Sequence, residues 1–146
     1  MERGWVIASE TCALDIVGAS YVRDIEPGEF VTINASGVHS RHFAEPRHAR
    51  CIFEHVYLAR PDSYLNGHSV NSTRVGIGRR LAKEHPCDGD LVIPVPESGM
   101  PAAVGYAQES GIPFAQGLTK NSYVGRTFIQ PSQTIRQLGI LSLIHI

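Results

Sequence analysis

The sequence has few of the features that mark secreted, membrane-spanning or nucleic-acid-binding proteins. Its three cysteines, Cys12, Cys51 and Cys87, are too few and too scattered for a disulfide framework. The opening MERGWVIASE has no basic segment followed by an apolar one, so we expect no secretory signal, and no apolar run is long enough to span a membrane. Thirteen basic and fourteen acidic residues give a net charge of −1, which argues against nucleic-acid partners. We therefore expect a cytoplasmic protein with neither nucleic-acid nor membrane partners.

Recognisable metal and nucleophile motifs are also missing. The seven histidines form no HxH or HExxH set, and there is no CxxC, so a zinc site built by this chain alone is not expected. A Ser-His-Asp triad has no support, because no GxSxG elbow exists. What remains is a chain of 146 residues, 42% apolar and 18% charged, which is typical of a globular protein with its own core.

The pattern of the first forty residues predicts strands and turns. WVIASE and EFVTINASG are typical of strands, and a turn at residues 26–29 starts the second. Between them, TCALDIVGA predicts a short helix that ends at Gly18. Residues 40–50, SRHFAEPRHAR, suit a connection between two parts of the chain.

From Cys51 onward the pattern alternates between strand and helix, which predicts an α/β layer with a parallel sheet and right-handed crossovers. The first helix places Val70, Val75, Ile77 and Leu81 among charged residues and ends before Pro86. The second has Pro101 in its first turn and Gly111 past its end. The segments, in order, are the strand CIFEHVYLA, the helix SVNSTRVGIGRRLAKEH, the doubly buried strand GDLVIPVPES, the helix GMPAAVGYAQESG and the strand IPFAQGLTKN.

Ligands of parallel sheets bind beyond the carboxyl ends of the strands, so the loops there are the candidate sites. PESG at residues 96–99 leads into a helix, whose free N–H groups and dipole favour an anion such as phosphate. Ser98 suits a phosphate or metal contact there. The alternative is structural: Ser98 caps the helix and Gly99 eases the turn. RPDS at residues 60–63 is interpreted as a turn with a capping side chain.

A second candidate loop, LTKNSYVGR at residues 118–126, holds Lys120, Asn121, Tyr123 and Arg126 within seven positions. A lysine and an arginine on a loop with glycine suit a polyphosphate, because the guanidinium offers a fork of donors. The alternative is a solvated polar loop. Long irregular loops in compact domains are more often functional lids.

Several of these stretches together resemble one enzyme family. They are CIFEHVYLARPDS, DLVIPVPESG, GYAQESGIPFAQGL and, most specifically, KNSYVGRTFIQPSQ. From about Trp5 to Ile140 the chain resembles the amidophosphoribosyltransferases, the glutamine-dependent enzymes that open de novo purine synthesis. The resemblance implies that residues 1–45 are the end of a β-rich glutaminase domain of the N-terminal-nucleophile fold, with its linker. Residues 46–140 would then be the N-terminal half of a type I phosphoribosyltransferase α/β domain.

The reaction that the resemblance implies is transfer of glutamine-derived ammonia to phosphoribosyl pyrophosphate, giving 5-phosphoribosylamine. Ser98 matches the family's Mg²⁺ position, and Cys51 matches a position that ligates an iron–sulfur cluster, of the [4Fe-4S] type, in some members. Purine nucleotides as feedback inhibitors and a homo-oligomeric parent are also implied. The residues that match the flexible lid over the substrate are Lys120, Asn121, Tyr123, Gly125, Arg126 and Thr127.

The sequence also departs from the family pattern. Ser122 stands where the family usually has arginine, and neither the glutaminase cysteine nor the acidic ribose-phosphate loop is found. The final LSLIHI, residues 141–146, is interpreted as a non-native tail. We therefore expect an internal fragment without catalytic residues of its own and inactive by itself. The alternatives are a non-catalytic phosphoribosyl-pyrophosphate or nucleotide-binding module and a base-salvage phosphoribosyltransferase, although the latter leaves the glutaminase-like start unexplained.

Overall fold

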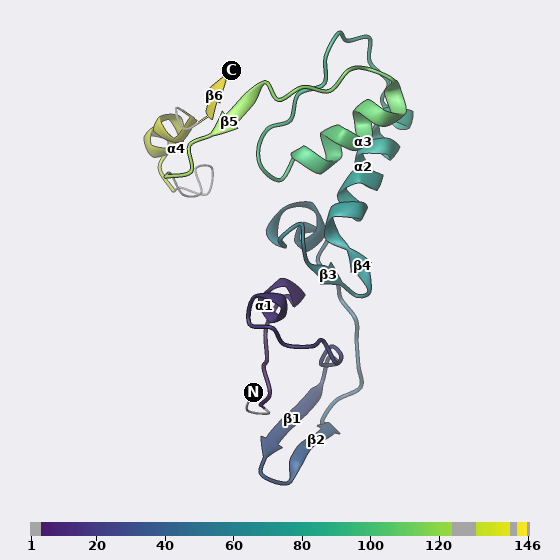
Figure 1. Cartoon of the computed structure of the whole chain (residues 1–146), viewed down its shortest axis with the longest axis vertical. Helices are drawn as coiled ribbons and strands as arrows, with labels where there is room; N and C mark the ends of the chain where they lie inside the picture. The colour runs from purple at the N-terminus through teal and green to yellow at the C-terminus, as the bar shows by residue number, and fades with distance from the viewer. Residues whose placement is uncertain (1–3, 124–130, 141–142, 146) are drawn as a thin grey trace. The chain divides into compact units, whose positions relative to one another are not determined.

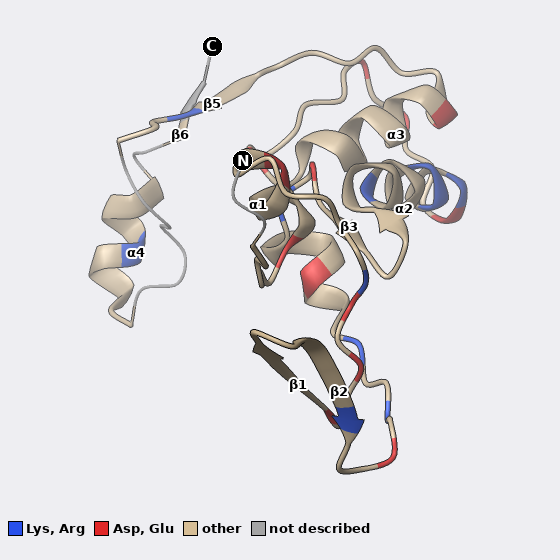
Figure 2. Ribbon diagram, turned by 60° about the horizontal axis from the view of Figure 1, so that its bottom comes forward, with Lys and Arg blue, Asp and Glu red and all other residues tan. Residues whose placement is uncertain are grey.

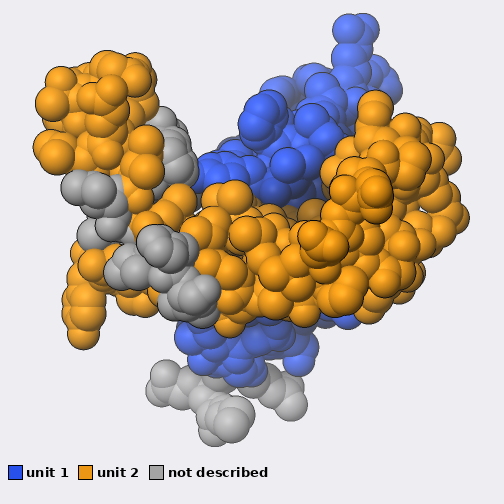
Figure 3. All heavy atoms as spheres, turned by 90° about the horizontal axis from the view of Figure 1, so that it is seen from above, with its two compact units in different colours: residues 1–70 blue, residues 71–146 orange. Residues whose placement is uncertain are grey.

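The computed structural model describes residues 4–123, 131–140 and 143–145 (Figure 1). The chain divides into two compact units, unit 1 (Met1–Val70) and unit 2 (Asn71–Ile146), which are coloured separately in Figure 3. Both units contain helices and strands, so the chain has a mixed α/β architecture, as the sequence predicts. None of the helices within the described ranges has the length and apolarity needed to cross a membrane.

Unit 1 is built from short elements. The predicted helix before Gly18 is confirmed: its last residue is Ile16, and Gly18 takes a left-handed φ of 67° while its N–H donates to the Asp15 carbonyl at 3.1 Å. A glycine is favoured there because a side chain strains that conformation. The elements in order are α1 (Thr11–Ile16), β1 (Glu29–Asn34), β2 (Gly37–His42), the π-helix η1 (Glu54–Leu58), β3 (Tyr64–Leu65) and β4 (His68–Ser69).

The strands β1 and β2 form an antiparallel hairpin, with register from Glu29 opposite His42 to Asn34 opposite Gly37. The predicted turn before β1 is confirmed, because the Glu29 N–H donates to the Glu26 carbonyl at 3.0 Å. At the tip, the Asn34 side-chain oxygen accepts the Ser36 N–H at 2.9 Å. Such short-range side-chain bonds favour asparagine in turns. The connection predicted for residues 40–50 begins later than expected, since β2 continues to His42.

Two predicted strands are wrong. WVIASE, residues 5–10, has no strand pairing, and residues 52–58 of CIFEHVYLA are helical, with η1 as a π-helix. The Ala59 N–H donates to the Glu54 carbonyl at 2.9 Å, five residues back. The alternation in this stretch hid a helical pattern, because Ile52 and Val56 are four residues apart.

Unit 2 contains two longer helices, and their predicted ends are confirmed. The first ends before Pro86, and the second has Pro101 in its first turn and a left-handed Gly111, φ 75°, as its C-cap. The elements are α2 (Val70–Glu84, which starts at the last residue of unit 1), α3 (Met100–Ser110), β5 (Leu118–Lys120), α4 (Gln133–Ile140) and β6 (Leu143–His145).

Helices α2 and α3 touch through glycine. A Cβ on Gly78 would lie 1.9 Å from the Ala102 carbonyl oxygen, and one on Gly105 would lie 2.0 Å from the Val75 carbonyl oxygen, closer than any Cβ can approach. At the helix ends, Lys83 pairs with Glu109 at 3.3 Å. Figure 2 shows the basic residues of this pair on α2 and acidic residues near the ends of the helices. The pair is therefore held by backbone contact, with charged side chains at its margin.

The buried face of α2 agrees with the prediction at Val70 and differs from it at Ile77 and Leu81. Its buried residues are four apart: Val70, Arg74, Gly78 and Ala82. Of the predicted apolar face, Ile77 and Leu81 are 39% and 46% exposed. Side-chain size misled the prediction there, because α2 approaches α3 most closely at Gly78, where a side chain would meet the backbone of α3.

The predicted parallel pairing across α3 is confirmed at one position. Val92 pairs with Phe114 in a parallel bridge, in which the Val92 N–H donates to the Pro113 carbonyl at 2.9 Å and the Ala115 N–H donates to the Val92 carbonyl at 3.0 Å. The expectation that the strand around Val92 is buried on both faces is wrong, since Val95 is 56% exposed and only Pro94 is fully buried. Among the described residues, the segment around Phe114 is the only one that pairs with the strand around Val92.

The strand β5 pairs antiparallel with β6, with Leu118 opposite His145 and Lys120 opposite Leu143. The second strand therefore lies within the predicted tail, residues 141–146. Figure 1 shows β6 next to β5 near the C-terminus.

Candidate functional site

The turn before α3 carries Ser98. The peptide bond between Pro96 and Glu97 is cis, and the Met100 N–H donates to the Glu97 carbonyl at 3.2 Å. A Cβ on Gly99 would lie 2.7 Å from the Val95 carbonyl oxygen, so the turn closes tightly on a glycine. The N-cap of α3 is Gly99, and no side chain caps it. The structural interpretation of Ser98 as the helix cap is therefore wrong, and its half-buried hydroxyl stands in the turn itself.

The electrostatics of this turn are mixed. The helix dipole is positive at the start of α3, and the first turn of the helix contains no acidic residue. However, the Met100 N–H is bonded to the Glu97 carbonyl, Pro101 has no N–H, and the Glu97 carboxylate is exposed in the turn itself. The dipole favours a phosphate, whereas the Glu97 carboxylate favours a cation.

The second predicted loop is only partly described. Lys120 ends β5 and is half-buried. The Asn121 side-chain oxygen accepts the Tyr123 N–H at 3.0 Å, which forms a tight turn, and Tyr123 is 99% exposed. The remaining predicted lid residues, Gly125, Arg126 and Thr127, lie outside the described residues.

The two loops leave the same end of a parallel pair. Beyond the Val92–Phe114 bridge, a Cβ on Gly117 would lie 2.9 Å from Cγ2 of Ile93, so the two segments run close together. Because parallel segments end at one edge, the turn with Ser98 and the strand with Lys120 both continue from that edge. No hydrogen bond or ion pair joins these two residues in the part of the chain that the structure describes.

Of the two metal groups that the resemblance implies, the residues of this chain are compatible with Mg²⁺ but not with an iron–sulfur cluster. Over the described ranges, no three His, Cys, Asp or Glu side chains gather as a metal site. Mg²⁺ commonly takes few protein ligands and completes its shell with water and substrate phosphates, so Ser98 remains compatible with it. An iron–sulfur cluster requires several cysteines, whereas Cys51 is an exposed free thiol and Cys12 is buried. The chain's own residues therefore do not fit the cluster.

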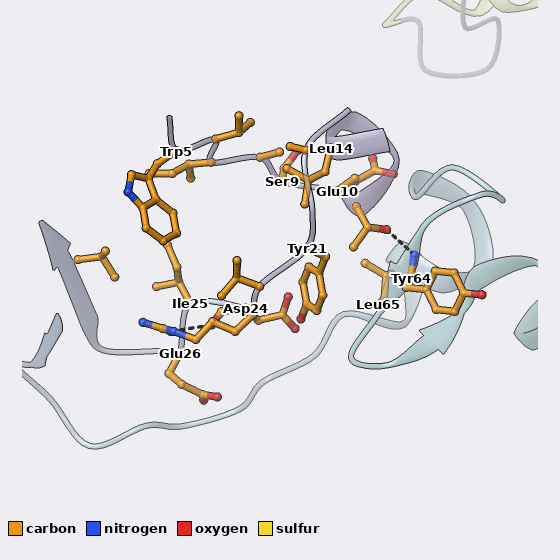
Figure 4. A pocket seen from close by; sticks show the side chains of 18 of the residues that line it. Trp5, Ser9, Glu10, Leu14, Tyr21, Asp24, Ile25, Glu26, Tyr64 and Leu65 are labelled. Atoms are coloured by element: carbon orange, nitrogen blue, oxygen red, sulfur yellow. Dashed lines mark hydrogen bonds between the residues drawn. The ribbon is translucent and has the colours of Figure 1, made fainter. Parts of the chain in front are cut away.

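Unit 1 contains a broad cavity of about 1090 Å³ that the sequence did not predict. Figure 4 shows Trp5 on one side of it and Tyr64 and Leu65, from β3, on the other. Trp5 is 57% exposed, and Tyr21 in the wall is 54% exposed. The only signal in the sequence was the number of apolar residues near its start, which the predicted strands would have buried.

Sequence reasoning also missed a polar cluster around Glu10. Ser63, interpreted as part of a simple turn, is fully buried, and its hydroxyl donates to the Glu10 carboxylate at 2.8 Å. The two residues are 53 positions apart, so no local pattern signals the contact.

No profile of a known protein family matches the chain. Individual curated proteins match it closely. The amidophosphoribosyltransferase of Mycobacterium tuberculosis is 71% identical over 140 residues, which is 96% of this chain and 27% of that protein. The amidophosphoribosyltransferase of Synechococcus elongatus is 58% identical over 137 residues, 93% of this chain and 28% of that protein. The chain therefore spans little more than a quarter of the length of these relatives.

Solved structures agree with the sequence matches. The chain resembles the glutamine phosphoribosylpyrophosphate amidotransferase from B. subtilis complexed with ADP and GMP, with a TM-score of 0.81 and 47% identity over 94% of this chain and 31% of that one. A structure described as the allosteric regulatory enzyme of purine biosynthesis matches with the same TM-score and identity, over 94% of this chain and 30% of that one.

At this identity and TM-score, the chain shares the fold class of the corresponding part of glutamine phosphoribosylpyrophosphate amidotransferase. Within this class, the chain belongs to the amidophosphoribosyltransferase family, whose members are pentosyltransferases.

Proposed function

We propose that the chain is part of an enzyme that transfers glutamine-derived ammonia to phosphoribosyl pyrophosphate, releasing pyrophosphate and forming 5-phosphoribosylamine. This is the first step of de novo purine synthesis. The observation that carries the proposal is 71% identity over 140 residues to amidophosphoribosyltransferases. Identity this high extends over 96% of the chain, so it is not confined to one short motif.

We propose the following division of the chain between the parent's domains. Residues 1–45 end a glutaminase domain of the N-terminal-nucleophile fold, residues 46–140 open a type I phosphoribosyltransferase domain, and residues 141–146 are a non-native tail. The β1–β2 hairpin supports the β-rich start, and the parallel bridge across α3 supports the α/β character of the second part.

In this proposal the substrate's pyrophosphate lies against the turn at residues 96–99. Its charge is matched by the positive end of the helix dipole at the start of α3. Mg²⁺, when bound, neutralises the charge that develops on the departing pyrophosphate, and Ser98 is the residue of this chain that would contact the ion. Lys120 supplies a positive charge at the start of a lid that excludes water when it closes. The proposed lid residues are Lys120, Asn121, Tyr123, Gly125, Arg126 and Thr127.

The remaining partners follow from the same assignment. Purine nucleotides are proposed as feedback inhibitors, and the complex of the B. subtilis enzyme with ADP and GMP supports this. A cytoplasmic homo-oligomer is proposed as the working form.

The proposal is tested by substituting the lid lysine in the complete product of the gene that contains this sequence. Lys120→Ala is expected to raise the KM for phosphoribosyl pyrophosphate by roughly tenfold or more, because a charge-assisted contact to phosphate is lost. The matched control is Lys83→Ala, which removes a lysine of α2 whose partner is Glu109. An equal effect of both variants would contradict a specific role for the lid.

A binding module without catalysis is the second candidate, and the positive end of the helix dipole at the start of α3 supports it. The two candidates differ in what the 146-residue chain does alone. A binding module retains measurable affinity for phosphoribosyl pyrophosphate in calorimetric titration. The enzyme-part proposal expects weak or no binding and no turnover, since the acidic ribose-phosphate loop is not found in this sequence.

A further inference from the structure

A carboxylate near the start of unit 1 is bonded to a turn fifty residues further along the chain. Oε2 of Glu10 accepts the backbone N–H of Arg60 at 2.9 Å and the hydroxyl of Ser63 at 2.8 Å. The thiol of Cys12 lies 3.8 Å from the same oxygen. Three donors from two distant segments therefore meet at one carboxylate oxygen.

A second hydrogen bond joins the next residue of each segment, Thr11 and Tyr64. The Thr11 hydroxyl oxygen accepts the N–H of Tyr64 at 2.8 Å, a bond that is drawn as a dashed line in Figure 4. Ser63 is fully buried and Cys12 is 4% exposed. The segment at residues 10–12 is thus fixed to residues 60–64 by consecutive bonds that are partly shielded from water.

The same turn is hydrogen-bonded to the first residue of α2. The Ser63 carbonyl accepts the N–H of Val70 at 3.0 Å, and Val70 is fully buried. The first N–H groups of a helix have no partner within the helix, so this bond satisfies one of them. Val70 is also the last residue of unit 1, so Ser63 connects the Glu10 carboxylate to the point where unit 1 ends.

The hydrogen bonds to Glu10 favour its ionised form. The Arg60 N–H and the Ser63 hydroxyl lower the pKa of Glu10, against the opposing effect of burial. The Arg60 guanidinium itself forms two bonds to Asp62, at 3.0 and 3.1 Å. Hydrogen bonds to an ionised acceptor are stronger than neutral ones, so the carboxylate is well suited to hold the turn.

We propose that Glu10 is a positioning residue that fixes the turn at residues 60–64 against α1 and, through Ser63, holds the first residue of α2 at the end of unit 1. The contacts of Glu10 with Arg60 and Ser63 are called the Glu10 latch. When the latch opens, the turn and the first turn of α2 loosen, while the β1–β2 hairpin and α3 keep their structure. The latch involves none of the residues proposed to bind substrate.

Hydrogen exchange of individual amides in the whole chain tests the latch. Glu10→Ala is expected to accelerate exchange at Arg60, Tyr64 and Val70 by roughly 10- to 100-fold, the range expected for losing a bond to a charged group. Amides of the β1–β2 hairpin and of α3 are expected to change less than about threefold. The matched control is Glu45→Ala, because Glu45 is an exposed carboxylate of the same unit.

Two further variants separate a latch from general destabilisation. Ser63→Ala removes the hydroxyl that meets Glu10, so the double variant is expected to exchange little faster than the more affected single variant. Glu10→Gln keeps an acceptor of the same shape without its charge, and an intermediate acceleration is expected even if Glu10→Ala does not fold. The proposal is overturned if Val70 exchanges at the wild-type rate in Glu10→Gln, or if hairpin and α3 amides accelerate as much as Val70. Fully additive effects in the double variant would also overturn it.

Discussion

Different kinds of contact hold each of the two units together internally. In unit 2, helices α2 and α3 meet backbone to backbone at Gly78 and Gly105. In unit 1, carboxylates hold the chain: Glu10 is bonded to Ser63, 53 positions away, and Glu29 is bonded to Arg23, six positions away. The helix contact of unit 2 is therefore sensitive to the addition of a single methyl group, whereas these carboxylate contacts of unit 1 are sensitive to the loss of charge.

The largest expected effect comes from adding a methyl group at the helix contact. Gly78→Ala places a Cβ 1.9 Å from the Ala102 carbonyl oxygen, so α2 and α3 must separate. Overpacking of this kind commonly costs about 1–3 kcal/mol, and more where backbone must move, so we expect a loss of about 3 kcal/mol or more. Denaturant unfolding followed by circular dichroism measures the loss.

The same helix offers a matched control. A Cβ on Gly76 would meet nothing within 4 Å, so Gly76→Ala tests the helical preference of alanine without a clash. This variant is expected to stabilise the chain by up to about 1 kcal/mol. Equal effects of the two substitutions would show that the close helix contact does not hold unit 2.

A smaller effect is expected when Glu29 is neutralised in unit 1. Its side chain is 3% exposed and bonds to Arg23 at 2.6 Å. The Arg23 guanidinium, followed by the Ser40 hydroxyl and the Glu26 N–H, lowers the pKa of Glu29 from 4.5 to about 2. Because the folded-state pKa is the lower one, this stabilisation is complete above pH 4.5 and is lost as the pH falls towards 2.

The check is the difference between wild type and Glu29→Gln, which removes the contribution of the other carboxylates. Unfolding midpoints of the two proteins, measured from about pH 6 to about pH 2, are expected to converge at the acid end. A constant gap across this range would contradict the role assigned to the ionised Glu29.

The smallest effect is expected at the exposed pair of Arg60 and Asp62. Their side chains are 62% and 53% exposed, and the atoms lie 3.0 Å apart. Exposed pairs contribute little because water and salt screen them. Asp62→Asn is therefore expected to leave the unfolding midpoint almost unchanged, measured by thermal melts at low and high salt. A large, salt-independent loss would place this pair among the contacts that hold unit 1.

Proline and glycine residues in the sequence correctly predicted where helices begin and end. Pro101 and Gly111 marked the ends of α3, and Gly18 marked the end of α1. On the buried face of α2, Val70 was predicted from its apolar side chain, whereas Gly78 was not predictable from residue type, because its place depends on the close approach of α3. The π-helix was missed because its apolar residues also alternate.

The two loops of the candidate site were assigned by different kinds of reasoning. The turn with Ser98 followed from the general position of ligands beyond parallel strands, whereas the lid was assigned by resemblance to a family. The contact between Glu10 and Ser63 had no signal in the sequence, because it depends on folding two segments together across 53 positions.

The most direct test of the functional account is an assay of pyrophosphate release from phosphoribosyl pyrophosphate. It is carried out with glutamine or ammonia on the complete product of the gene and, in parallel, on the 146-residue chain. We expect glutamine-dependent release by the complete product and neither glutamine hydrolysis nor phosphoribosylamine formation by the chain alone. Turnover by the chain alone, or a complete product inactive with both nitrogen donors, would contradict the account.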